Sequence, residues 1–128
     1  MDRSAPLIAV VEDDDSVRKA LGRLLRSAGL SAGTYASGEE FLNAIKSCPP
    51  GCVLLDLQLP GISGMEVLCT LRQCGLKLPV VFVTATSDPD IREQAMRSGA
   101  DGWLCKPVDQ LALIETISAA LGKVIRGT

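Results

Sequence analysis

Residues 7–14 read LIAVVEDD, an apolar run of five residues that leads directly into three acidic ones. The same arrangement, an apolar run ended by a polar residue, recurs three times: residues 52–55 before Asp56, 80–83 before Thr84, and 103–105 before Lys106. Each run has the length of a buried strand. If the strands are parallel, their polar ends meet at one edge of a sheet, which is where open α/β sheets bind ligands.

Amphipathic segments separate the apolar runs and predict helices. Apolar residues recur at spacings of three and four over residues 17–28, 41–45, 67–71, 91–96 and 111–121. A further short strand is expected over residues 32–35. Strands that alternate with helices in this way are typical of a doubly wound α/β domain, with a parallel sheet and helices on both faces.

Short polar and glycine signals mark the expected helix ends. They are Asp15 as the N-cap and Gly29 as the C′ residue of the first helix, Ser37 with Glu40 as a capping box, and Asp88 with Pro89 as the start of a later helix.

The length of 128 residues suits a single domain. Residues 1–122 are expected to form it. Residues 123–128 are expected to be a C-terminal tail or the start of a linker, with the chain trailing beyond the last helix from Gly122. The net charge of −2 gives no basic surface for nucleic acid. No apolar run has the length of a membrane span and no signal peptide is visible, so we expect a cytoplasmic protein without membrane contact.

The chain has five cysteines and no histidine. The cysteine spacings are not those of zinc fingers, and an odd number cannot pair completely within the chain. We expect them to be buried small apolar residues in a reducing compartment. The lack of histidine excludes Ser-His and Cys-His catalytic arrangements as well as zinc sites with histidine ligands.

Three carboxylates at the strand ends, those of Glu12, Asp13 and Asp56, indicate a cation site. Carboxylates this close repel one another unless a cation lies among them, and Mg²⁺ prefers such hard oxygen ligands. The alternative is that the acidic residues 13–15 only cap the first helix and complement its dipole. We prefer capping for Asp14 and Asp15, and cation binding for Glu12 and Asp13.

Asp56 is the candidate nucleophile. A carboxylate can accept a phosphoryl group to form an acyl phosphate, with no general base needed to ionise it. This reaction requires positive charge around the phosphoryl oxygens, which Mg²⁺ and Lys106 can supply. The hydroxyl of Thr84 can donate a hydrogen bond to one of these oxygens.

Together, these motifs resemble those of receiver domains in two-component response regulators. The similarity covers essentially the whole chain and rests on four motifs: VEDD at 11–14, LDLQLPG at 55–61 with Gly64, VTA at 83–85, and KP at 106–107. It implies a flavodoxin-like (CheY-like) fold with five parallel strands in the order 2-1-3-4-5. It also implies that Asp56 accepts a phosphoryl group from a sensor histidine kinase.

The resemblance assigns a role to each site residue. Glu12 and Asp13 match the acidic pair that binds Mg²⁺, or Mn²⁺ in its place, and Gln58 would add its backbone carbonyl. The remaining matches are Thr84 as the switch hydroxyl, Ala85 as the small residue beside the phosphoryl group, Lys106 as its lysine partner, and Lys106–Pro107 as a bond that is typically cis.

Four positions depart from the family pattern or tune it. Trp103 falls where the family has an aromatic rotamer switch, usually Tyr or Phe, and a simple core or edge aromatic is the open alternative. Glu12 stands where Asp is commoner, so its longer arm extends toward a metal-bound water. Gln58 and Thr86 match positions that set the rate of dephosphorylation.

The implied mechanism is a two-state switch with slow self-dephosphorylation, not an enzyme with turnover. Phosphorylated Asp56 attracts Thr84 and Lys106, and the surface of the fourth helix and fifth strand changes. Residues 16–21 and 35–42 are similar to receivers joined to a LuxR-type helix-turn-helix domain. This favours a transcription regulator that reaches DNA only through a domain absent from this chain and forms a homodimer on phosphorylation.

Other functions remain as alternatives. The chain can be a stand-alone regulator that acts by protein contact, a receiver-like module that only binds partners, or a Mg²⁺-dependent phosphatase that forms an aspartyl phosphate. The phosphatase would need a second acid near Asp56, and Gln58 cannot serve as one. A flavin mononucleotide site is disfavoured because the acidic residues 12–15 would repel its phosphate.

Overall fold

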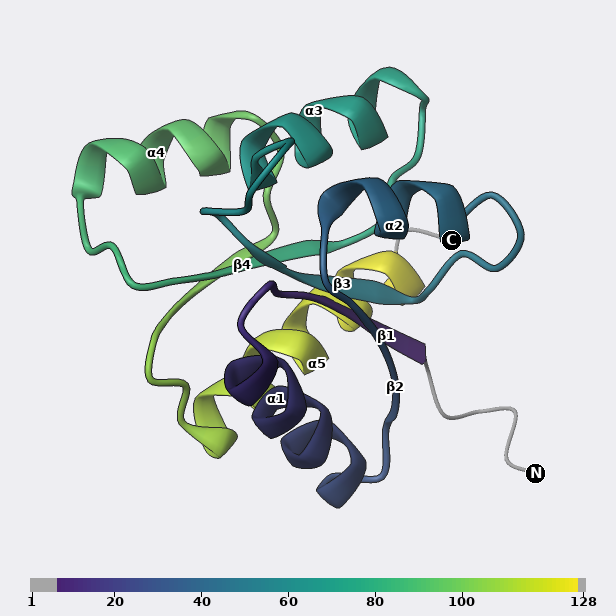
Figure 1. The fold of residues 1–128 in the computed structure, drawn as a ribbon, viewed down its shortest axis with the longest axis vertical. Coiled ribbons are helices and arrows are strands. Elements are labelled where there is room, and N and C mark those ends of the chain that lie inside the picture. The colour runs from purple at the N-terminus through teal and green to yellow at the C-terminus, as the bar shows by residue number, and fades with distance from the viewer. Residues whose placement is uncertain (1–6, 127–128) are drawn as a thin grey trace.

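Five strands and five helices alternate along the chain (Figure 1). The computed structural model describes the backbone of residues 7–126 and the side chains of residues 7–122. The elements are β1 (Leu7–Val11), α1 (Asp15–Ser27), β2 (Ser31–Tyr35), α2 (Gly38–Ala44), β3 (Cys52–Asp56), α3 (Gly64–Gln73), β4 (Val80–Thr84), α4 (Pro89–Arg97), β5 (Gly102–Cys105) and α5 (Gln110–Arg126).

The strands form one parallel sheet in the order β2-β1-β3-β4-β5, which confirms the predicted fold class and strand order. The register pairs Val11 with Leu55, Asp56 with Val83, and Thr84 with Cys105. The carboxyl ends of β1, β3, β4 and β5 therefore lie at the same edge. Residues that follow these ends are brought together by the sheet itself.

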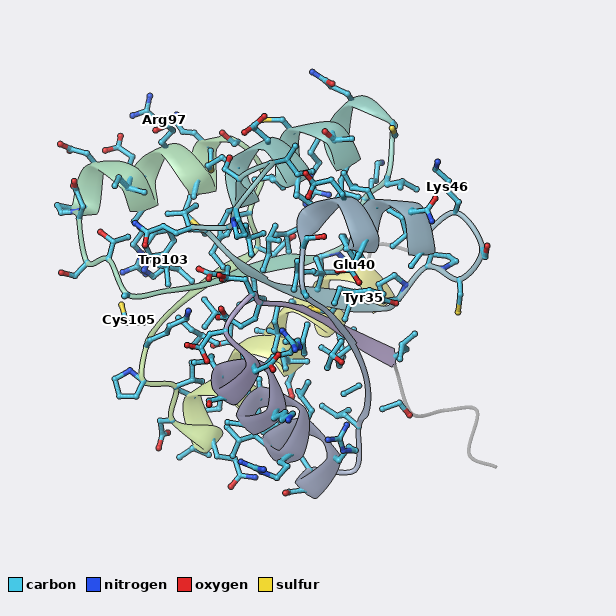
Figure 2. All side chains as sticks on the ribbon, viewed as in Figure 1. Tyr35, Glu40, Lys46, Arg97, Trp103 and Cys105 are labelled. Atoms are coloured by element: carbon cyan, nitrogen blue, oxygen red, sulfur yellow. The ribbon has the colours of Figure 1, made fainter. Side chains whose placement is uncertain are left out.

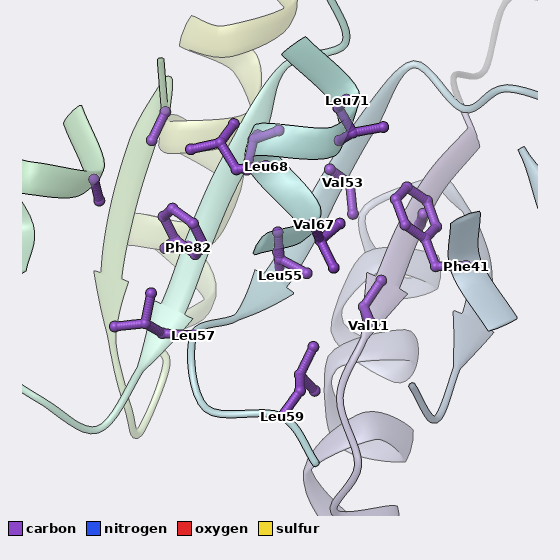
Figure 3. Close-up of a cluster of buried hydrophobic side chains, with 14 residues drawn as sticks. Val11, Phe41, Val53, Leu55, Leu57, Leu59, Val67, Leu68, Leu71 and Phe82 are labelled. Carbon is purple, nitrogen blue, oxygen red and sulfur yellow. The ribbon is translucent and has the colours of Figure 1, made fainter. Parts of the chain in front are cut away.

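The sheet separates two apolar cores because successive side chains of a strand point to opposite faces. On one face, Ala9, Val11, Val53 and Leu55 pack against α2, α3 and α4 (Figure 3). On the other face, the alternate residues of the same strands, with Cys52 among them, pack against α1 and α5. Figure 1 shows the same division, with α2, α3 and α4 on one side of the sheet and α1 and α5 on the other. Strands covered on both faces read as continuous apolar runs, as these do in the sequence.

The N-terminal end of α1 differs from the predicted signal, whereas that of α4 follows it. The N-cap of α1 is Asp14, whose side chain accepts a hydrogen bond from the Val17 amide, so the prediction of Asp15 as the cap is wrong. Asp15 is the first helical residue, where its charge still complements the dipole. Asp88 caps α4 and Pro89 opens it, as predicted.

The predicted capping box of α2 is only half formed. Ser37 accepts a hydrogen bond from the Glu40 amide, but the Glu40 carboxylate accepts from the Ser37 hydroxyl. A complete box, which the sequence analysis did not identify, opens α3 between Ser63 and Glu66. Gly29 follows α1 with a φ of 84°, as expected for a C′ residue.

The last helix is longer than predicted. It continues to Arg126, so the expectation that the chain trails beyond the helix from Gly122 is wrong for residues 122–126. Residues 127–128 of the predicted tail lie outside the described residues. No helix in the described part of the chain is long and apolar enough to cross a membrane.

The cysteines also differ from the prediction. Only Cys52, in β3, is buried, whereas Cys48, Cys69, Cys74 and Cys105 are exposed. The expectation that they are buried apolar residues is therefore wrong for four of the five, and all five are free thiols. Burial, with the nearby charge of Asp101 as a smaller cause, raises the pKa of the Cys52 thiol to about 12.

Candidate phosphorylation site

The predicted site residues converge at the carboxyl edge of the sheet. Carboxylate oxygens of Glu12, Asp13 and Asp56 all lie within 4.8 Å of one another. Glu12 and Asp13 follow β1, and Asp56 ends β3. The group therefore combines residues separated by more than forty positions, and the β1–β3 pairing holds them together.

Asp56 is almost enclosed, with 5% of its surface exposed. One carboxylate oxygen, Oδ1, accepts a hydrogen bond from the Gln58 amide at 3.1 Å. The other, Oδ2, lies 3.3 Å from the Lys106 ammonium. These partners hold both oxygens in place, so the carboxylate is fixed in orientation before any ligand arrives.

Glu12 forms a second, closer contact with the same lysine. Its Oε1 lies 2.6 Å from the Lys106 ammonium, and only 2% of the residue is exposed. Its Oε2 accepts a hydrogen bond from the Asp14 amide at 3.1 Å. Burial lowers the pKa of Lys106, but the hydrogen bond that its ammonium donates to Glu12 and the charges of Asp56 and Glu12 outweigh this effect. The pKa of Lys106 is therefore raised above its usual value.

The charge balance of the site suits a divalent cation. Three carboxylates face one ammonium group, which leaves an excess of negative charge among oxygen donors. Hard oxygen donors are the ligands that Mg²⁺ prefers. Asp13 is exposed, so its carboxylate is open to solvent. The residues present therefore fit the predicted Mg²⁺ site.

Thr84 lies at the end of β4 and is fully buried. Its Oγ1 accepts a hydrogen bond from the Thr86 amide at 3.3 Å. Its backbone carbonyl accepts another from the Lys106 amide at 2.9 Å. The strand pairing thus couples the hydroxyl and the lysine, the two groups predicted to contact a phosphoryl group.

The remaining predicted switch residues surround this strand end. Ala85 is exposed, and the Lys106–Pro107 bond is cis, as the resemblance implied. Trp103 is half-buried beneath α4 (Figure 2), with its ring 6.2 Å from that of Phe82 in an edge-to-face arrangement. It packs against the core on the α4 side of the sheet, which suits both the switch role and the core role. Its role as a switch stays a prediction.

Arg18 is a neighbour of the site that sequence reasoning missed. Its Nη1 donates to the backbone carbonyls of Glu12 at 2.9 Å and Asp13 at 3.4 Å. Its Nη2 pairs with the Asp15 carboxylate. The i, i+3 spacing from Asp15 indicates the ion pair. No sequence signal indicates the two backbone contacts, because they depend on how α1 leaves the sheet.

Known proteins are similar to this chain over most of its length. Residues 8–118 match the family described as the response regulator receiver domain. The chain belongs to this family. Response regulators act with histidine kinases, and as a family their receivers are signalling domains, generally not enzymes.

Individual relatives agree with this assignment. The receiver is 38% identical over 123 residues to the transcriptional regulatory protein FixJ of Azorhizobium caulinodans, covering 96% of this chain and 58% of that protein. A solved receiver protein from Burkholderia phymatum is 46% identical, with a TM-score of 0.80 and coverage of 91% of this chain and 95% of the other. A DNA-binding LuxR-family response regulator from Staphylococcus aureus is 27% identical, with a TM-score of 0.84 and coverage of 91% of this chain and 98% of the other.

The receiver spans little more than half the length of the curated relatives it matches, between 52% and 58% for the first three. The relatives are transcriptional response regulators, including LuxR-family and NtrC types. The predicted similarity to receivers of transcription regulators is thereby confirmed.

Proposed function

We propose that this receiver accepts a phosphoryl group from a sensor histidine kinase on Asp56. A single observation carries this proposal. The only carboxylate of β3 is fixed between the Gln58 amide and the Lys106 ammonium, beside two further carboxylates that provide a cation site. Such a site neutralises phosphoryl oxygens and directs a carboxylate oxygen at phosphorus.

In the transfer step, a bond forms between a carboxylate oxygen of Asp56 and phosphorus. The bond between phosphorus and the kinase's histidine nitrogen breaks, and its electron pair returns to that nitrogen. The side chains of Glu12, Asp13 and Asp56, with the backbone carbonyl of Gln58, would hold Mg²⁺, or Mn²⁺ as a substitute. The bound metal supplies positive charge that offsets the charge of the phosphoryl oxygens.

Lys106 and Thr84 respond to the added group. The phosphoryl oxygens compete with Glu12 for the Lys106 ammonium, and they accept a hydrogen bond from the Thr84 hydroxyl. The Thr84 side chain thereby moves toward the phosphoryl group. Because Thr84 pairs with Cys105 at the end of β5, this movement is transmitted to the β4–α4 loop and β5. A phosphoryl group that contacts the two states differently shifts their populations. Ala85 leaves room for the group, and Trp103 responds as α4 moves.

The output is transcription, through a DNA-binding domain outside these residues. The relatives' names and the share of their length that the receiver spans favour this conclusion. We expect the phosphorylated receiver to form a homodimer and to act in the cytoplasm. A stand-alone regulator that acts by protein contact is the alternative. A phosphatase is disfavoured because Gln58 occupies the place of a second acid.

The test is the intact mass of the protein after incubation with Mg²⁺ and acetyl phosphate. We expect a gain of one phosphoryl group that is stable to acid and labile to base, and no gain in Asp56→Asn. If acetyl phosphate fails, the same assay is run with phosphorylated histidine kinases. A folded protein that gains no phosphoryl group from either kind of donor would contradict the proposal.

A further inference from the structure

The link between β1 and α1, residues 12–14, carries two acidic residues of the cation site, Glu12 and Asp13. The first hydrogen bond of α1 goes from the Arg18 amide to the Asp14 carbonyl, so the carbonyls of Glu12 and Asp13 lie outside the helical pattern. The Glu12 carbonyl is part-buried and needs another donor, whereas the Asp13 carbonyl lies at an exposed position. Arg18 supplies it, with one guanidinium nitrogen donating to both carbonyls.

The side chain of Arg18 is itself held in place. Only 16% of it is exposed, and its second terminal nitrogen pairs with the Asp15 carboxylate in the first turn of α1. The planar guanidinium can therefore contact the link with one nitrogen and the helix with the other. Arg18 therefore connects the link to the first turn of α1.

The two acidic side chains depend on this link to different degrees. The Glu12 carboxylate has its own partners in the Asp14 amide and the Lys106 ammonium. Among the described residues, no hydrogen bond is made by the Asp13 carboxylate, which is exposed. Its position near Asp56 therefore follows from the backbone that carries it.

We propose that Arg18 is a positioning residue of the cation site. By holding the carbonyls of Glu12 and Asp13, it sets the direction in which the Asp13 carboxylate leaves the backbone and keeps it within reach of a cation bound beside Asp56. The inference rests on the proposed function, since it concerns the same cation. Groups that orient metal ligands in this way commonly control affinity as strongly as some ligands do.

The charge of Arg18 and its positioning role predict opposite changes in cation affinity when the residue is removed. Arg18 carries a positive charge next to a cation site, so loss of the charge alone would strengthen cation binding. Loss of positioning would weaken it. The direction of the change therefore separates the two roles, and a weaker cation affinity in a folded Arg18→Ala indicates the lost orientation of the link.

The measurement is direct titration of the whole chain with Mn²⁺, in which electron paramagnetic resonance detects the free ion. We expect Arg18→Ala to bind Mn²⁺ roughly tenfold more weakly than the wild type. Arg18→Lys keeps the charge and one donor, so its affinity should fall between the two. Lys19→Ala removes a neighbouring exposed charge of α1 that does not touch the link, and its affinity should change by less than about twofold.

Equal or tighter Mn²⁺ binding by a folded Arg18→Ala would overturn the proposal. Folding of each variant is checked by urea unfolding. If Arg18→Ala does not fold, Arg18→Lys tests the role, because it keeps the charge and any weaker Mn²⁺ binding then reflects the lost contacts to the link. Failure of the proposed function looks different, because a wild type that neither binds Mn²⁺ nor becomes phosphorylated would refute the site itself. A wild type that does both, with Arg18→Ala and Arg18→Lys unimpaired, refutes only the role of Arg18.

Discussion

Thr84 separates phosphorylation from its structural consequence. Its hydroxyl is buried next to the site but makes no bond to Asp56, so Thr84→Ala leaves the nucleophile and its partners in place. We expect Thr84→Ala to gain a phosphoryl group from acetyl phosphate to a similar extent. We also expect phosphorylation to change Trp103 fluorescence in the wild type. In Thr84→Ala this change should be largely lost, since the hydroxyl no longer attracts the phosphoryl group.

The matched control for this variant is Thr70→Ala. Thr70 lies in α3, where its hydroxyl donates to the Glu66 carbonyl, away from the strand ends. Both the phosphorylation and the fluorescence response of Thr70→Ala should equal those of the wild type. An unchanged response in Thr84→Ala would show that the hydroxyl does not couple the phosphoryl group to the rest of the receiver.

Lys106 gives the receiver a pH dependence of defined sign. Burial lowers its pKa, but the hydrogen bond that the ammonium donates to Glu12 and the charges of Asp56 and Glu12 outweigh this effect, so the pKa is raised in the folded state. The stability that the protonated lysine contributes is therefore complete below the unfolded pKa of about 10.4, and it is lost as the pH rises through the higher folded value. At neutral pH, Lys106→Met leaves the buried Glu12 without this partner and should cost on the order of 1–3 kcal/mol.

Urea unfolding of wild type and Lys106→Met between pH 7 and 11 measures this contribution, since other titrating groups affect both proteins alike. The difference in unfolding free energy should stay constant up to about pH 10 and narrow only above it. A difference that already closes between pH 7 and 9 would show that Lys106 is not held in its protonated form by Glu12 and Asp56.

At the scale of elements, the start of α3 approaches β3 so closely that only glycine fits. A Cβ on Gly64 would overlap the Asp56 carbonyl oxygen and come within 2.8 Å of Leu57 Cα, both of them backbone atoms that cannot turn away. Gly64→Ala should therefore destabilise the receiver by about 1–3 kcal/mol. It should also slow phosphorylation, because the displaced backbone carries Asp56.

Gly22→Ala is the control, since Gly22 is a buried glycine in the middle of α1. A Cβ there would meet the end of the flexible Arg26 side chain at 3.2 Å, and alanine favours a helix by about 1 kcal/mol over glycine. Urea unfolding should show no loss of stability, and the time course of intact mass should match the wild type. Equal stability and equal rates in Gly64→Ala would rule out a tight α3–β3 contact.

Most elements could be predicted from sequence because their signals are local. The apolar runs that became β1, β3, β4 and β5 are covered on both faces, and such strands are read directly from composition. The errors in the predicted elements lie at the ends of helices. Asp14 and Asp15 are both suitable N-caps of α1, and which one caps the helix depends on the path of the chain after β1. The helix α5 extends past Gly122 because no Pro follows to end it.

At the scale of the molecule, the residues of the site could be predicted from the sequence, but the hydrogen bonds and ion pairs among them could not. The parallel sheet brings Asp13, Asp56 and Lys106 to one edge whatever their side chains do. Lys106 lies closer to Glu12 than to Asp56, and Arg18 donates to the β1–α1 link. These contacts depend on the length and direction of the side chains in the folded protein. The four exposed cysteines were mispredicted because a small residue carries little signal of burial. Cys69 lies on α3, Cys105 ends β5, and Cys48 and Cys74 lie outside the helices and strands.

Cys52 offers a test of the whole fold, because it lies buried in β3 between β1 and β4. Burial raises the pKa of its thiol to about 12, so in the native state it is both shielded and protonated, and the thiolate is the reactive form. With a chromogenic disulfide reagent at neutral pH, four thiols should react quickly and the fifth only as the sheet opens, at a rate set by the free energy of unfolding. In Cys52→Ala the slow phase should vanish, and in urea the wild type should release all five thiols at once. Five fast thiols in the native wild type would mean that the sheet opens locally at β3, which a central strand with both faces covered should not permit.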